Sequence, residues 1–152
     1  MDLTSNAFDS GGTIPARYTC DGENGSPALE WSGVPPEAQS LVLIVDDPDS
    51  TNGPWSHWVL YNIPPEQSGL SQGVQQGGQL SWGAVQGRND FGDVGYGGPC
   101  PGHGATHRYY FRLYALDEKL DLTPGATRAQ VMDRIHGQVL DSTELMARYA
   151  RS

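Results

Sequence analysis

Leu41-Val42-Leu43-Ile44-Val45, followed directly by Asp46-Asp47-Pro48-Asp49, is the stretch that decides the fold. A continuous apolar run with a β-branched bias is typical of a strand that is buried on both faces. Pro48 cannot donate a hydrogen bond to a neighbouring strand, so the strand has to end there. The stretch therefore predicts a central strand over residues 41–45 with acidic side chains at its exit.

The segments on either side alternate between apolar and polar residues, as strands with one buried face do. Residues 28–31 alternate before a Gly-Pro turn. Residues 57–63 predict a second strand, with one face made of His57, Val59, Tyr61 and Ile63. Residues 108–116 predict a third, with one face made of Tyr109, Phe111, Leu113 and Ala115. The tail over residues 143–149 fits a strand or a helix, and we favour the strand.

Helix signals occur together only near the C-terminus. Thr127 can cap a helix, Gln130 follows three residues later as in a capping box, and Gly137 is a natural stop. The 20 Gly and 11 Pro among 152 residues favour short strands joined by turns. We therefore predict one domain over residues 1–152, all-β with minor α, with one short helix near the C-terminus.

Charge and composition exclude several classes of function. The formal net charge is −9, from 18 acidic and 9 basic residues, which disfavours nucleic acids and anionic lipid surfaces. No apolar run is long enough for a transmembrane segment, and residues 1–4 do not resemble a signal peptide, so we expect a cytoplasmic protein. Cys20 and Cys100 are the only cysteines. In a reducing compartment we expect free thiols, although a bridge between them is left open.

Polar side chains that suit anion binding stand near the predicted strand ends. Asp47 follows the central strand, His57 opens the next, and His107 and Tyr109 are two residues apart, so they share a face. Imidazole and phenol groups can donate hydrogen bonds to an oxyanion, while a carboxylate can orient an imidazole or accept an amine. Residues 66–107, rich in Gly, Gln and Ser, are too long for an ordinary connection, which indicates a functional loop.

An ordered set of motifs resembles the phosphatidylethanolamine-binding protein family, in particular its bacterial and archaeal Raf-kinase-inhibitor-like branch. The set includes Asp46-Asp47-Pro48-Asp49, His57-Trp58, residues 87–92, residues 97–101 and His107-Arg108-Tyr109. The resemblance implies an antiparallel β-sandwich with a small anion pocket at one end. It implies that the pocket is formed by Asp47, His57, His107 and Tyr109, with Gly98, Cys100 and Pro101 on the adjoining loop and Asp49 and Trp55 at the rim. The chain departs from the family pattern at Ser50-Thr51 and Gly102, which predicts a looser rim. It also departs at Gln138, so no partner role of the C-terminal segment is carried over from relatives.

The leading functional hypothesis is a protein that binds a small anion, such as phosphate, a phosphoethanolamine-like head group or a carboxylate, and is not an enzyme. Neither a cofactor nor a metal is expected. One alternative is a metal-dependent enzyme, because Asp47, His57 and His107 have the composition of a two-histidine, one-carboxylate site. Another is an inhibitor of a serine protease or kinase whose pocket is only regulatory. A kinase or protease partner rests on the resemblance alone, and a homodimer is left open.

Overall fold

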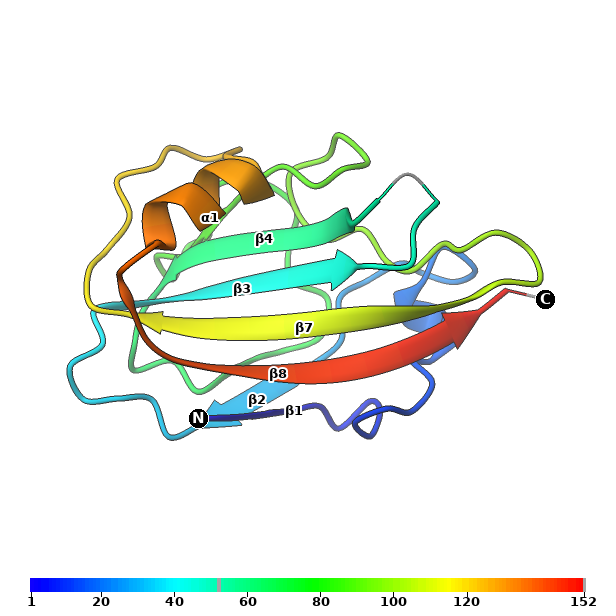
Figure 1. Ribbon diagram of the computed structural model, residues 1–152, viewed down its shortest axis with the longest axis horizontal. Coiled ribbons are helices and arrows are strands. Elements are labelled where there is room, and N and C mark those ends of the chain that lie inside the picture. Colours follow the sequence, from blue (N-terminus) through cyan, green and yellow to red (C-terminus); the bar gives the residue numbers. More distant parts are fainter. Residues whose placement is uncertain (52, 152) are drawn as a thin grey trace.

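The predicted central strand is β3 (Ser40–Asp47), in which every residue is buried. The structure is a computed structural model that describes residues 1–51 and 53–151. β3 lies in the middle of a five-stranded antiparallel sheet with the order β6-β4-β3-β7-β8 (Figure 1). Its other members are β4 (Trp55–Ile63), β6 (Val85–Gln86), β7 (Thr106–Leu116) and β8 (Val139–Ala150). The strand predicted over residues 41–45 thus extends to Asp47.

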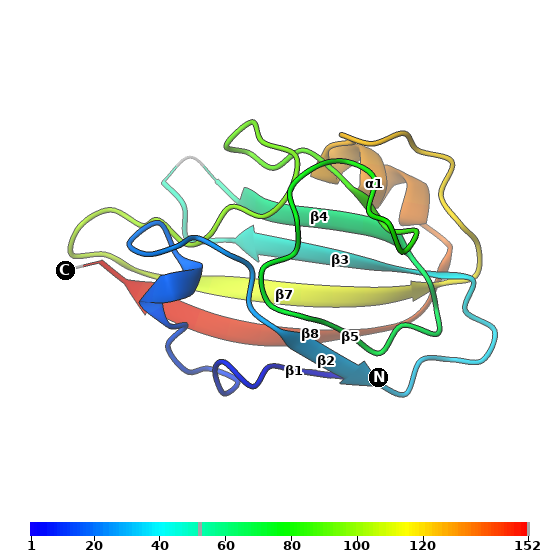
Figure 2. The same ribbon diagram turned by 180° about the vertical axis from the view of Figure 1, so that it is seen from behind.

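A smaller sheet covers one face of this large sheet, as the view from behind shows (Figure 2). It contains β1 (Asp2–Thr4), β2 (Leu29–Ser32) and β5 (Gly69–Leu70), and a short 3-10 helix, η1 (Ala16–Tyr18), precedes β2. The main core between the two sheets contains Trp31 from β2, and from the large sheet Leu43, Val45, Trp58, Phe111 and Leu145. The all-β prediction with a sandwich of antiparallel sheets is confirmed.

The helix α1 (Arg128–Ile135) covers part of the opposite face of the large sheet (Figure 1). Thr127 accepts a hydrogen bond from the backbone of Gln130, and the Gln130 side chain accepts one in return, so the predicted capping box is present. Val131 and Ile135 pack into a second apolar cluster with β3 and β4. Among the described residues this is the only α-helix. No helix in this part of the chain is long and apolar enough to cross a membrane.

The tail forms a strand, as we favoured, but a longer one than predicted. β8 pairs with β7 along nearly its whole length, from Thr106 opposite Ala150 to Leu116 opposite Val139. Its inward side chains, Leu145, Ala147 and Tyr149, complete the main core. The long segment over residues 66–107 is not a continuous loop, because it contributes β5 and β6 to the edges of the two sheets and the first two residues of β7.

The prediction that His57, Val59, Tyr61 and Ile63 share one face of their strand is wrong. Val45 pairs with Trp58 whereas Asp46 pairs with Ser56, so His57 is an extra residue in β4. Such a bulge shifts the alternation by one position and re-aims a side chain. Val59 and Tyr61 therefore lie under α1, whereas Trp58 enters the main core. A second irregularity, with Asn62 at a positive φ of 53°, returns Ile63 to the main core.

The expectation of free thiols is also wrong, because Cys20 and Cys100 form a disulfide. Their Cα atoms lie 5.4 Å apart although 80 positions separate them in the sequence. The expectation rested on the redox state of a compartment and not on the fold. The fold places the segment after η1 directly against the stretch that leads into β7, where Cys20 N–H donates to the carbonyl oxygen of Pro99 over 3.1 Å.

Candidate functional site

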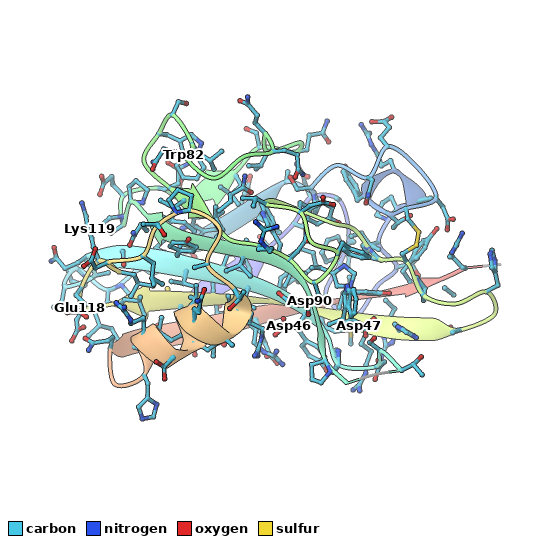
Figure 3. The ribbon with its side chains drawn as sticks, turned by 90° about the horizontal axis from the view of Figure 1, so that it is seen from above. Asp46, Asp47, Trp82, Asp90, Glu118 and Lys119 are labelled. Atoms are coloured by element: carbon cyan, nitrogen blue, oxygen red, sulfur yellow. A yellow bond between two sulfur atoms is a disulfide. The ribbon has the colours of Figure 1, made fainter. Side chains whose placement is uncertain are left out.

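A small cavity of about 230 Å³ opens where β3 ends and where β4 and β7 begin. It is lined by Asp47, Ser50, Thr51, Trp55, His57, Phe91, Cys100, Pro101, Gly102 and His107, and we call it the pocket. Because β3 is antiparallel to both neighbours, its exit lies beside their entries. Figure 3 shows Asp47 far from Glu118 and Lys119, which lie at the left end of the molecule.

Asp47 holds His107 in place. Nδ1 of His107 donates to one carboxylate oxygen of Asp47 over 2.6 Å, and the other oxygen accepts the backbone N–H of Asp49 over 2.8 Å. A carboxylate can only accept, so the proton of this bond belongs to Nδ1 and the ring turns its Nε2 edge away from Asp47. Asp47 is thus a partner of a histidine, one of the roles that its chemistry suggested.

His57 reaches the pocket through the bulge in β4 and is almost fully buried. Its Nδ1 donates to the carbonyl oxygen of Gly97 over 2.7 Å, which leaves Nε2 as the remaining polar atom of the ring. Burial lowers the pKa of His57, although Gly97 and the charge of Asp47 act in the opposite direction. Burial therefore keeps this imidazole neutral at neutral pH.

Tyr109, predicted as a pocket residue, does not line the cavity but packs against the two histidines that do. Its ring meets that of His57 edge to face at 5.2 Å between centroids and stacks on that of His107 at 6.4 Å. The side chain is 1% exposed, and its hydroxyl has no hydrogen-bond partner of normal geometry among the described residues. Burial raises the pKa of Tyr109 and the nearby charge of Asp47 adds to this, so the hydroxyl keeps its proton. A buried O–H donor without an acceptor is rare and calls for an explanation.

Two aromatic side chains form the mouth of the pocket. Trp55 contacts Phe91 edge to face at 5.5 Å, and Phe91 contacts His57 at 5.2 Å. Phe91 is 44% exposed, and the indole N–H of Trp55 is buried without a partner among the described residues. Sequence reasoning did not select Phe91, although an apolar side chain in a stretch of Gly, Asn and Asp was a usable signal.

Not every predicted site residue lines the pocket. Asp49 instead accepts three hydrogen bonds from Arg108, one from its backbone and two from its guanidinium, at 2.8 to 3.0 Å. The guanidinium of Arg108 lowers the pKa of Asp49 to about 2. Asp49 therefore fastens the β3–β4 connection to the start of β7. Ser50 and Thr51, the rim positions that depart from the family pattern, do line the pocket.

The remaining wall is the pocket loop, residues 98–102. Cys100, Pro101 and Gly102 face the cavity, whereas Gly98 holds the loop in place through a hydrogen bond from its N–H to the side chain of Asn24 over 2.8 Å. A Cβ at Gly98 would collide with the carbonyl oxygen of Tyr18, which explains why glycine occupies this position.

Comparison with known proteins identifies the family of the chain. The family model described as phosphatidylethanolamine-binding protein matches residues 4–150. The chain belongs to this family. A UPF0098 protein of Methanothermobacter thermautotrophicus is 54% identical over 151 residues, which cover 99% of each chain.

Solved structures of family members have the same fold. A phosphatidylethanolamine-binding protein homologue from Chlamydia trachomatis, CT736, superposes with a TM-score of 0.90 at 44% identity, covering 99% of this chain and 97% of the other. YbcL of E. coli, described as a member of the mammalian family, superposes with a TM-score of 0.89 at 34% identity, covering 99% and 98%. The resemblance noted from the motifs is therefore confirmed at the level of family and fold.

Proposed function

We propose that the pocket binds a small oxyanion, namely phosphate, a phosphorylated head group or a carboxylate, without chemical conversion of the ligand. The observation that carries this proposal is that two histidines held in fixed orientations meet in one cavity, with the buried hydroxyl of Tyr109, which lacks a hydrogen bond of normal geometry, packed beside them. An oxyanion in the pocket would supply the missing acceptor. The unpaired indole N–H of Trp55 is a further donor at the same cavity.

The protonation of the histidines indicates how such an anion would be held. Because Nδ1 of both rings carries a proton that a neighbour accepts, Nε2 of a neutral ring has only a lone pair. An oxyanion is held at Nε2 either when the ring gains a second proton or when the anion brings a hydroxyl of its own. Monohydrogen phosphate and singly protonated phosphate monoesters have a negative charge for a protonated ring and a hydroxyl that can donate to a neutral ring. A fully ionised carboxylate has only the charge, so the phosphates fit the pocket better.

Regulation of a kinase or a protease is the second candidate function. It is favoured by family membership alone, and the pocket would then control a protein contact near Phe91, the exposed aromatic at its mouth. A metal-dependent reaction has less support. Among the described residues, no group of three or more His, Cys, Asp or Glu is arranged to hold a metal ion. Both carboxylate oxygens of Asp47 and Nδ1 of His57 instead bond to protein partners.

Titration with phosphate, followed by the imidazole NMR signals of the four histidines, tests the binding proposal. Signals of His57 and His107 should shift with millimolar phosphate, whereas that of His136, exposed at the end of α1, should not. His57→Ala should abolish the response at His107, and His136→Ala serves as the matched control. Absence of any shift, or an unchanged response in His57→Ala, would disprove the proposal.

A further inference from the structure

The Cys20–Cys100 disulfide is attached to a wall of the pocket. Cys100 lines the cavity together with its two successors, Pro101 and Gly102. Cys20 lies outside the lining, in the segment that follows η1. The bond thus connects three consecutive wall residues to a part of the fold that does not contact the ligand space.

Hydrogen bonds also attach the two ends of this wall to the rest of the fold. On one side, Gly98 is bonded to Asn24 and Pro99 to Cys20. On the other side, Gly104 N–H donates to the carbonyl oxygen of Arg151 over 2.7 Å, and Ala105 N–H donates to that of Gly102 over 3.0 Å. The disulfide is the covalent link between the wall, at Cys100, and the segment after η1. Breaking it would loosen the wall, including the bond from Ala105 to Gly102, without unfolding the sheets.

The position of the bond suits thiol–disulfide exchange. Cys100 is exposed, so an external thiolate can reach its sulfur. The guanidinium of Arg151 lies 3.7 Å from Sγ of Cys100 and also pairs with Asp21 over 3.0 Å. A cation at this distance stabilises a thiolate on Cys100 when that sulfur is released.

We propose that the disulfide is a redox-operated latch, closed when the pocket is competent to bind its anion and opened by a dithiol. One thiolate of the dithiol attacks Sγ of Cys100 and expels Cys20 as a thiolate, which forms a mixed disulfide. The second thiol of the dithiol then displaces Cys100. The protein gains two electrons and two protons, and the dithiol loses them as it becomes a disulfide. The effect on affinity rests on the proposed function, whereas the loosening of the wall does not.

The latch makes separate predictions for affinity and for local order. Reduction should weaken phosphate binding about tenfold, because the free wall has to be ordered again on binding. Amide exchange at Gly104 and Ala105 should accelerate on reduction, whereas exchange at amides within the paired core of β3 and β7 should not. Dithiothreitol is the reductant of choice because it is uncharged and cannot occupy an anion site.

The experiment measures phosphate affinity and amide exchange for the oxidised protein, the reduced protein and Cys20→Ser. Cys20→Ser breaks the bond without altering a residue of the pocket lining, and it should behave like the reduced protein whether or not dithiothreitol is present. If this variant does not fold, the comparison of the oxidised with the reduced wild-type protein tests the latch by itself.

The outcomes separate the latch from the proposed function. Weaker phosphate binding and faster exchange at Gly104 and Ala105 on reduction support the latch. Equal affinity in the two redox states overturns it and leaves the proposed function intact. If the oxidised protein fails to bind phosphate, the proposed function is wrong. In that case unchanged exchange overturns the latch as well, whereas faster exchange retains the loosening of the wall.

Discussion

Tyr109→Phe should weaken anion binding without destabilising the anion-free protein. The Tyr109 hydroxyl is buried and has no hydrogen-bond partner of normal geometry among the described residues, although the carboxylate of Asp47 is near. Burying a hydroxyl without a well-formed hydrogen bond costs about 1–3 kcal/mol, part of which the nearby carboxylate of Asp47 offsets. We therefore expect the free energy of unfolding to stay constant or to rise by up to about 1 kcal/mol, which corresponds to about 2–4 °C in Tm for a chain of this length.

The same substitution removes one donor to a charged ligand. A hydrogen bond to a charged group contributes about 1.5–3 kcal/mol, so phosphate affinity should fall by a factor of about 10 to 100. Tyr61→Phe is the matched control, because the Tyr61 hydroxyl donates to the carbonyl oxygen of Thr123 over 2.5 Å and accepts from the backbone of Ala126 over 3.3 Å. Its removal should cost about 1–2 kcal/mol and leave phosphate affinity unchanged.

Urea unfolding without phosphate and calorimetric titration with phosphate measure the two effects. Tyr109→Phe and Tyr61→Phe should change stability in opposite directions, or the former not at all. A destabilisation of Tyr109→Phe as large as that of Tyr61→Phe would mean that the hydroxyl has a partner in the free protein. Unchanged phosphate affinity in Tyr109→Phe would refute the assignment of this hydroxyl to the ligand.

Three other substitutions test the structure around the pocket. Burial lowers the pKa of His57, so below about pH 6.5 the unfolded chain binds a proton at this residue that the folded chain does not bind. The free energy of unfolding should therefore fall as pH drops from 7 to 5, and it should fall less steeply in His57→Asn. Urea unfolding at each pH measures both slopes. Asp49→Asn should lower Tm at pH 6, and the difference in Tm between the variant and the wild type should shrink between pH 4 and pH 2. The reason is that the pKa of Asp49 is lowered to about 2, so its stabilisation is lost as pH falls through that value. A difference in Tm that does not depend on pH would contradict the ion pair with Arg108. Cys20→Ser should destabilise the oxidised protein by about 2–4.5 kcal/mol, because the bond closes a loop of 80 positions; a loss below about 0.5 kcal/mol in urea unfolding would contradict this value.

Local patterns predicted the regular parts of the fold. Three features depend only on residues close together in the sequence: the apolar run of β3, the alternation of β7 and the capping box of α1. A single sequence is therefore enough to predict them. The position of His57 was different. Strict alternation put it on the face of Val59, whereas the bulge turns it to the other side of the sheet. A bulge depends on pairing with β3, which is not visible within β4 alone.

Contacts between distant segments account for the rest. The disulfide joins residues 80 positions apart, and Asp49 is bound by Arg108 across a separation of 59. Neither pair has a local signature. For Asp49 the family resemblance suggested the rim, but its carboxylate accepts two hydrogen bonds from the guanidinium of Arg108 instead. Asp47, His57 and His107 were brought together as predicted, because antiparallel strands place an exit beside two entries.

A crystal structure of the oxidised protein grown with phosphate tests the central claim most directly. The account predicts a phosphate in the pocket with oxygen atoms about 3 Å from Nε2 of His57, Nε2 of His107 and the hydroxyl of Tyr109. A pocket that contains only water at millimolar phosphate, or a phosphate bound elsewhere on the surface, would contradict it.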